Sequence, residues 1–381
     1  MADPNSPTVP VGRLLLVVGA LVALLAGLDG AAVFAGLHGP FQDIQFAGIH
    51  GLLTVFGFLG TVVALRRAVS AGALKSSAGW AYLAPAASVA GTVLILLQAL
   101  DFPGSGSRLT PAIAWAIAMG ALLTIDAFLW RESPATATVI QGLGALAGLV
   151  GIILWGIGVP QWIAVPWWLL FLVLAIVGER VKLARASFGD GAAHRVLVES
   201  VLAFIVLGLS FIQPVLIYPF FGMALVVLLI DVMLHDAPLK AMDAKGEAKF
   251  TATATLAAYA WGILAGILWV LYGPLDFGFP YDAVIHAVTI GFAFSMLMAH
   301  APIIAPAVTG KDVPYSPAMW VIWGILQVGL VTRIAASTHE LEWLWRVGGI
   351  IDIAAILAFV VMVAVLMIIG GRKGKASAQS C

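Results

Sequence analysis

The histidines are the residues of this chain best suited to hold a metal, because its single cysteine is the last residue, Cys381. A lone terminal cysteine excludes an internal disulfide, a thiolate metal cage and a thiolate haem ligand within the body of the chain. A metal bound there would therefore be held by histidine or by oxygen. The depth of each of the seven histidines along the apolar segments decides which of them could act together.

Two histidines, His50 and His286, fall at similar depth in apolar segments from distant parts of the sequence. His50 is about two turns into the second expected span and His286 about one turn into the tenth. Two neutral imidazoles on facing helices can bind the iron of a b-type haem, with the porphyrin between the helices. Gly48 and Gly51 would let a flat ring approach the His50 helix. Small residues also mark plain helix contacts, however, and each histidine could simply bond a neighbouring hydroxyl or carbonyl.

Three further histidines are candidate metal ligands with other roles equally open. His300 lies fourteen residues beyond His286, about 21 Å deeper, so one iron cannot bind both. It could be a second-site ligand, a proton-relay group or a cap on carbonyls that the following prolines leave free. His38 and His339 are expected in the first and last external loops, where they are candidate copper ligands, although loop histidines are usually solvated.

Three arginines are expected on the outer side, the level of His50 and His286. Arg333, Arg346 and Arg108 could pair there with haem propionates, and Arg333 is the best placed of them. An interfacial arginine also commonly extends to water and lipid headgroups without such a partner.

Carboxylates within apolar segments are functional candidates by default. Asp29 and Asp352 are expected on the outer side, where they could orient an imidazole, carry protons or pair with an arginine. Asp126 and Asp231 are expected close enough to the inner interface to be solvated. Glu199 falls within the seventh expected span.

These side chains are positioned by a long series of apolar segments. The 381 residues are 62% hydrophobic and 10% charged, with a mean hydropathy of +1.07, whereas soluble domains carry about 25% charged residues. We expect an all-α fold, a polytopic integral membrane helical bundle of about 12 transmembrane helices, in one domain over residues 1–381. The sixth and eighth spans are expected to be short, with about fifteen residues each. The expected spans are 14–34, 44–65, 79–100, 111–130, 136–157, 163–177, 196–217, 220–234, 251–272, 283–307, 317–336 and 344–369.

The placement of charge predicts the orientation. Sixteen of the nineteen Lys and Arg residues fall on one side of this partition, so the positive-inside rule favours an N-in/C-in protein of the cell inner (plasma) membrane. Residues 1–12 and 370–381 are then cytoplasmic tails, the second of them weakly ordered with its basic residues at lipid headgroups. The formal net charge of zero gives no reason to expect a nucleic-acid partner, and the lipid bilayer is the expected one.

Two sequence stretches carry a family resemblance. The stretch HGLLTVFGFLG begins at His50, and the stretch HAVTIGFAFSMLMAHAPII begins at His286. Together with twelve spans, both termini inside and Arg333 one turn from the end of the eleventh span, they resemble the NnrS-like haem-containing membrane proteins, within the wider haem–copper oxidase subunit I superfamily. The topology match covers most of the chain, and the motif match covers about forty residues.

The resemblance implies haem b between His50 and His286 and a role in redox or nitric oxide/respiratory metabolism. It also implies a membrane or periplasmic electron donor and the chemistry of an oxidoreductase. The chain departs from the oxidases in lacking histidines on the sixth and seventh expected spans and the His-x-His arrangement on the tenth. A binuclear oxygen-reducing centre is therefore not expected.

A secondary transporter is the alternative. Twelve spans with both ends inside is a common carrier layout, and Gly and Pro breaks could line a substrate path without haem. No inverted or parallel repeat is evident in the sequence, which disfavours this alternative.

Overall fold

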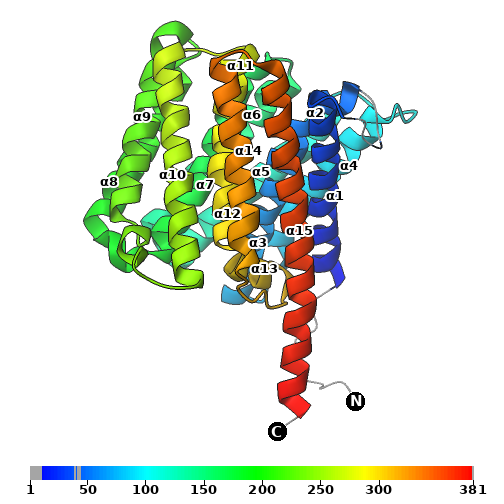
Figure 1. The fold of residues 1–381 in the computed structure, drawn as a ribbon, viewed down its shortest axis with the longest axis vertical. Coiled ribbons are helices and arrows are strands. Elements are labelled where there is room, and N and C mark those ends of the chain that lie inside the picture. Colours follow the sequence, from blue (N-terminus) through cyan, green and yellow to red (C-terminus); the bar gives the residue numbers. More distant parts are fainter. Residues whose placement is uncertain (1–10, 38–39, 41–43, 380–381) are drawn as a thin grey trace.

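A computed structural model of the chain describes residues 11–37, 40 and 44–379. The described residues form helices and connecting turns, and the long helices stand side by side in one bundle (Figure 1). Twelve described helical runs are long and apolar enough to cross a membrane, the number expected from the sequence. These runs are Val11–Phe34, Phe46–Leu74, Ala78–Ala99, Leu109–Glu132, Thr136–Gly156, Gln161–Leu183, Arg185–Leu209, Pro214–His235, Glu247–Tyr272, Gly278–Ala299, Ala318–Thr338 and Glu342–Gly370.

Several runs are composed of more than one helical element. The first half contains α1 (Val11–Phe34), α2 (Ile44–Leu52), η1 (Leu53–Gly60), α3 (Thr61–Leu74), η2 (Ala78–Tyr82), α4 (Leu83–Ala99), α5 (Leu109–Glu132), α6 (Thr136–Gly156) and α7 (Gln161–Leu183). The second half contains α8 (Arg185–Leu209), α9 (Pro214–His235), η3 (Pro238–Ala241), α10 (Glu247–Tyr272), α11 (Gly278–His286), η4 (Ala287–Phe294), α12 (Ser295–Ala299), α13 (Ala301–Thr309), α14 (Ala318–Thr338) and α15 (Glu342–Gln379). The elements η1 and η4 are π-helical. The first continues the helix that carries His50, and the second continues the helix that carries His286.

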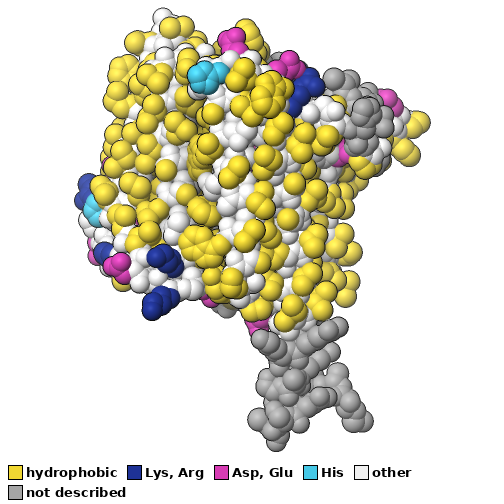
Figure 2. All heavy atoms as spheres, viewed as in Figure 1, with side chains coloured by type: hydrophobic (Ala, Val, Ile, Leu, Met, Phe, Trp, Pro, Cys, Tyr) yellow, Lys and Arg dark blue, Asp and Glu magenta, His cyan; other side chains and the backbone are white. Residues whose placement is uncertain are grey.

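The apolar surface of the bundle fits a lipid environment. Hydrophobic side chains cover most of the flank seen in Figure 2, and the charged ones gather towards the ends of the helices. Helices satisfy their own backbone groups, which a chain surrounded by hydrocarbon requires. The most enclosed runs are those of α7 and of α11–η4–α12, of which 78% is buried within the bundle.

The sixth and eighth runs are not short, contrary to expectation. The sixth extends to Leu183 rather than ending at residue 177, and it contains Glu179 and Arg180. Hydropathy stops the span at these charges, but both have partners of opposite charge inside the bundle, so the helix continues through them. The helix break expected near residue 218 lies instead at residues 210–213, and Pro219 is tolerated inside α9.

Both ends of the described chain lie at one end of the bundle. Figure 1 places the start of α1 and the end of α15 at this end, which we call the terminal end, and the start of α11 at the opposite end. An even number of crossings accounts for this arrangement. The helix α15 continues to Gln379, so most of the segment expected to be a weakly ordered tail from residue 370 is helical. Residues 1–10 of the expected N-terminal tail lie outside the described residues.

Candidate functional site

A cavity of about 680 Å³ lies towards the end of the bundle away from the termini and is lined by both His50 and His286. We call it the histidine cavity. Its wall also contains residues of α1, α7 and α15. Its volume is within the range of about 300–1,000 Å³ usual for cofactor and ligand pockets. The structure therefore brings together the two histidines that depth along the sequence had paired.

The His50 ring is oriented by its own helix. Its Nδ1 lies 2.6 Å from the carbonyl oxygen of Ala47, and because a carbonyl only accepts, Nδ1 must donate. In the neutral ring, Nε2 then carries the lone pair, and it has no hydrogen-bond partner among the residues described. Phe34 packs edge-on against the ring, with centroids 5.4 Å apart. A carbonyl bond on one nitrogen and a free second nitrogen is the arrangement common in metal-binding histidines.

Open space adjoins the His50 helix within the cavity wall. Both Gly48 and Gly51 line the cavity, and a Cβ atom added at either position would meet nothing within 4 Å. These glycines therefore do not serve close helix packing, the alternative that the sequence left open for them. They leave the backbone accessible to a flat group.

The His286 ring is held by Asp282, one turn earlier on α11. The Nδ1 atom of His286 donates to the Asp282 carbonyl oxygen at 2.8 Å and lies 3.1 Å from the Asp282 carboxylate. That carboxylate also accepts from Arg333 Nε and Nη2, at 2.8 and 2.7 Å, and from Trp345 Nε1 at 2.7 Å. A carboxylate behind a histidine fixes the ring and raises its basicity as a ligand. Sequence reasoning missed Asp282, although its spacing of four residues from His286 was a usable signal.

The three arginines expected near haem propionates are placed differently from one another. Arg333 lines the histidine cavity, but its guanidinium is already paired with Asp282 and lies 4.6 Å from the Trp345 ring centroid. Arg346 pairs with Glu342 on the same helix, with both side chains largely exposed. Arg108 is exposed at the start of α5 and does not line this cavity. The structure thus groups only Arg333 with the two histidines.

A π-helical segment follows each histidine of the cavity. The segment η1 starts three residues after His50, and η4 starts directly after His286. Insertions of this kind are rare and occur frequently at functional sites. Each segment carries a Gly-Phe pair, and the phenyl rings of Phe58 and Phe294 stack with centroids 5.8 Å apart. The segments η1 and η4 are therefore in contact beside the histidine cavity.

The glycines of these segments permit close packing against other helices, α1 for η1 and α10 for η4. A Cβ added at Gly57 would lie 2.8 Å from Ala23 Cβ, and one at Gly291 would lie 2.5 Å from the Trp261 ring. Real Cβ atoms do not approach so closely, so these positions require glycine. The glycines in the sequence pattern that follows the two histidines thus have a packing cause.

Asp352 of α15 also lines the histidine cavity. Its residue exposure is 1%, and neither carboxylate oxygen has a hydrogen-bond partner among the described residues. Pairing with an arginine was one of the alternatives that the sequence left open for Asp352, and Arg333 pairs with Asp282 instead.

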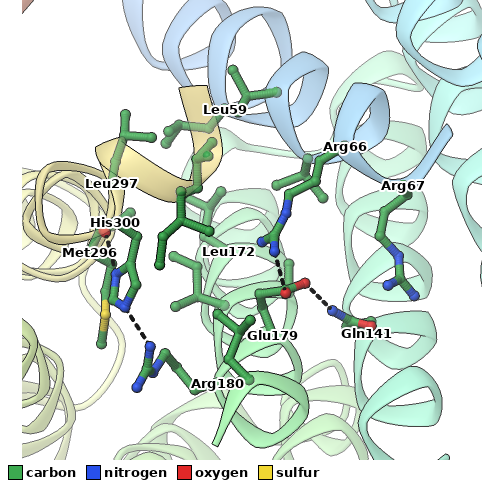
Figure 3. Close-up of a pocket in the computed structure, with 18 of the residues that line it drawn as sticks. Leu59, Arg66, Arg67, Gln141, Leu172, Glu179, Arg180, Met296, Leu297 and His300 are labelled. Carbon is green, nitrogen blue, oxygen red and sulfur yellow. Dashed lines mark hydrogen bonds and ion pairs between the residues drawn. The ribbon is translucent and has the colours of Figure 1, made fainter. Parts of the chain in front are cut away.

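A second, smaller cavity of about 100 Å³ lies between α3, α7 and the α12–α13 break, and Figure 3 shows the side chains that line it. Arg66, Arg67 and Arg180 line it, and we call it the arginine cavity. His300 lies on its wall, with Nδ1 donating to the Met296 carbonyl oxygen at 2.9 Å and Nε2 accepting from Arg180. With both ring nitrogens engaged, His300 is not free to bind a metal as it stands. The Met296 carbonyl also accepts from the His300 backbone N–H at 3.2 Å, so this contact is not the cap on proline-freed carbonyls that the sequence left open.

Buried ion pairs hold the helices around the arginine cavity. Arg180 binds the Asp236 carboxylate through Nε and Nη2, both at 2.8 Å, and Tyr259 donates to the same carboxylate at 2.6 Å. Arg66 pairs with Glu179 at 2.6 Å, as Figure 3 shows. These charges fall inside the predicted bundle, and each pair joins helices distant in sequence.

Asp126 is not solvated, contrary to expectation. Its residue exposure is 3%, and it pairs with Arg67. Asp231 instead pairs with Arg195 and His235 at the surface between α8 and α9. Nearness to a helix end therefore did not predict exposure, because the arginine partner of Asp126 comes from another helix.

Only one of the two candidate copper ligands, His339, lies within the described residues. His339 is exposed at the end of α14, and His38 lies outside the described residues. In the described part of the chain, no group of three or more His, Cys, Asp or Glu side chains has the arrangement of a metal site. A haem held by two histidines needs no such group.

Residues 13–368 match the family described as a domain of unknown function (DUF8744), and the chain belongs to that family. A comparison with curated proteins finds no match.

Proposed function

We propose that this member of the DUF8744 family is an integral membrane haem protein that holds haem b in the histidine cavity between His50 and His286. The observation that carries the proposal is the state of the two rings. Each donates Nδ1 to a carbonyl of its own helix, and each leaves Nε2 at the wall of one cavity without a hydrogen-bond partner among the described residues. Neutral imidazoles in this state are iron ligands.

The surroundings of the two rings also fit this group. The open backbone at Gly48 and Gly51 suits a flat macrocycle, and Asp282 behind His286 is the outer partner that metal-binding histidines use. Haem bound here would supply one-electron chemistry at iron. Arg333, with Nε and Nη2 committed to Asp282, keeps Nη1 for a propionate. Its first role is to hold Asp282.

We place the protein in the inner (plasma) membrane with both termini in the cytoplasm. Sixteen of nineteen basic residues then face the cytoplasm, and the histidine cavity opens towards the outer side. From there, a membrane or periplasmic electron donor could reach the cavity. Our proposal for the biological role, redox or nitric oxide/respiratory metabolism, rests on the likeness of the His50 and His286 stretches to NnrS-like proteins. Copper at His38 or His339 gains no support.

The test is haem content measured with matched histidine variants. We expect purified protein from haem-supplemented cells to show a Soret band and a pyridine haemochrome. His50→Ala and His286→Ala should lose most of both, while the control His339→Ala, at an exposed histidine, keeps them. A His286→Gly variant should regain absorbance when imidazole is added, because the free base can occupy the vacated ligand position. Wild-type protein without a Soret band would falsify the proposal.

A haem-free secondary transporter is the second candidate. Its supporting observation is the presence of two cavities towards opposite ends of the bundle, together with the helix break at His300 between α12 and α13. Broken helices beside cavities are typical of carriers. Substrate flux into vesicles by iron-free protein, retained in His50→Ala, would favour this function over the first.

A further inference from the structure

Asp352 is the buried charge-bearing group of the histidine cavity that the proposed haem ligation does not use. Neither of its oxygens has a described hydrogen-bond partner, at 1% residue exposure. An ionised carboxylate buried without donors is strongly disfavoured, whereas the neutral acid loses much less on burial. Carboxylates placed in this way within membrane helices are functional candidates by default.

The charges that face Asp352 leave it without a dedicated counter-ion. Its neighbour helix α14 contributes Arg333, whose guanidinium is committed to Asp282 of α11. The helix α1, which also contacts α15, carries Asp29, which does not line the cavity. The cavity wall adds the imidazoles of His286 and His50. The paired Arg333 and Asp282 cancel, so one further positive charge in the cavity would favour the ionised form of Asp352.

We propose that Asp352 is a proton-binding site of the histidine cavity. Asp352 carries a proton while the cavity is otherwise neutral and releases it when one positive charge enters. On release, the O–H bond breaks, its electron pair stays on the carboxylate oxygen, and the proton passes to cavity water. On reduction by a one-electron reductant such as dithionite, one electron removes the added charge and one proton returns to Asp352. This redox step rests on the proposed haem function, whereas proton binding by itself does not.

The first experiment uses the full-length protein without haem. Infrared spectra at neutral pH should contain a carboxylic-acid C=O band that is absent in Asp352→Asn and displaced in Asp352→Glu. The matched control is Asp231→Asn, which removes a membrane-span carboxylate that is paired and remote from the cavity; it should keep the band. Identical carboxylic-acid regions in wild type, Asp352→Asn and Asp352→Glu would overturn the proposal. The Asp352→Glu variant keeps the test valid if the asparagine variant does not fold.

The second experiment measures the haem midpoint potential against pH. Full coupling of one proton to one electron shifts the potential by about 59 mV for each tenfold change in proton activity. We expect a slope approaching this value in wild type and in Asp231→Asn, and a nearly flat line in Asp352→Asn. Equal slopes in wild type and Asp352→Asn would refute the coupling while leaving haem binding intact. If no haem is bound, the proposed function fails, and the infrared result still decides whether Asp352 holds a proton.

Discussion

Replacing Asp282 by asparagine tests how the site is held together. The Asp282 carboxylate accepts two hydrogen bonds from Arg333 and one from Trp345, and it lies 3.1 Å from the His286 ring. Asparagine keeps the shape but has one acceptor oxygen and an NH₂ group, which would face a donor of Arg333 or Trp345. The substitution thus removes the charge partner of Arg333 and the orienting group of His286 together.

The expected magnitude follows from these contacts. A hydrogen bond to a charged group contributes about 1.5–3 kcal/mol, and removing one partner of a fully buried pair costs about 3–5 kcal/mol. Asp282 and Arg333 keep 16% and 11% of their side-chain surface exposed, so we expect a loss of about 2–4 kcal/mol in the free energy of unfolding. Loss of an outer-shell partner weakens metal binding by about 10–100-fold.

Two measurements on the same preparation separate these effects. The thermal unfolding midpoint in one detergent reports stability, and the Soret absorbance that remains after dilution against apomyoglobin reports haem affinity. The matched control is Glu132→Gln, which breaks the exposed Lys75–Glu132 pair between α3 and α5, away from the histidine cavity. Exposed pairs contribute about 0–1 kcal/mol, so this variant should resemble wild type in both measurements.

The reasoning fails if Asp282→Asn unfolds and releases haem as wild type does. A lowered unfolding midpoint with unchanged haem retention would keep the structural role of Asp282 and reject its role behind His286. Only the loss of both matches the geometry described above.

Three further predictions concern other parts of the bundle. Asp236→Asn should lower the free energy of unfolding by about 3–5 kcal/mol, because it leaves Arg180 buried without a counter-charge. Denaturant titration measures this change, and an unaltered unfolding midpoint would show that the ion pair is dispensable. Gly291→Ala should cost about 1–3 kcal/mol in the same assay, because its Cβ would lie 2.5 Å from the Trp261 ring. Gly48→Ala should leave the unfolding midpoint within about 0.5 kcal/mol of wild type but weaken haem retention by roughly tenfold, and equal retention would show that the open space there is not used.

Hydropathy and charge predicted the number of helices because both depend on local composition. Apolar runs long enough to cross a bilayer can be recognised from sequence alone, and the structure contains twelve such helical runs among its described residues, as expected. Their ends were less predictable where charges enter a helix. Glu179 and Arg180 looked like the end of a span, but they lie inside one because Arg66 and Asp236 neutralise them from elsewhere in the chain.

The candidate site was also predictable in part, because the depth of a residue in an apolar run can be read from the local sequence. Matched depth along two spans was enough to pair His50 with His286, and both line one cavity. Depth alone could not rank the arginines, since Arg108 shares the expected side with Arg333 yet does not line the cavity. The π-helical segments were also not foreseen, because the extra residue in each turn is imposed by packing between segments and has no distinct local composition.

The stacked Phe58 and Phe294 rings limit the movement of water and protons along the bundle. Residues of η1 and η4 border the histidine cavity at Val55 and Ile290 and the arginine cavity at Leu59 and Ala293. The two phenyl groups therefore form part of an apolar layer between the two cavities. A continuous file of water molecules could not pass between these rings while they stay stacked. Water or protons moving along this line from one cavity to the other would require the Phe58 and Phe294 side chains to separate.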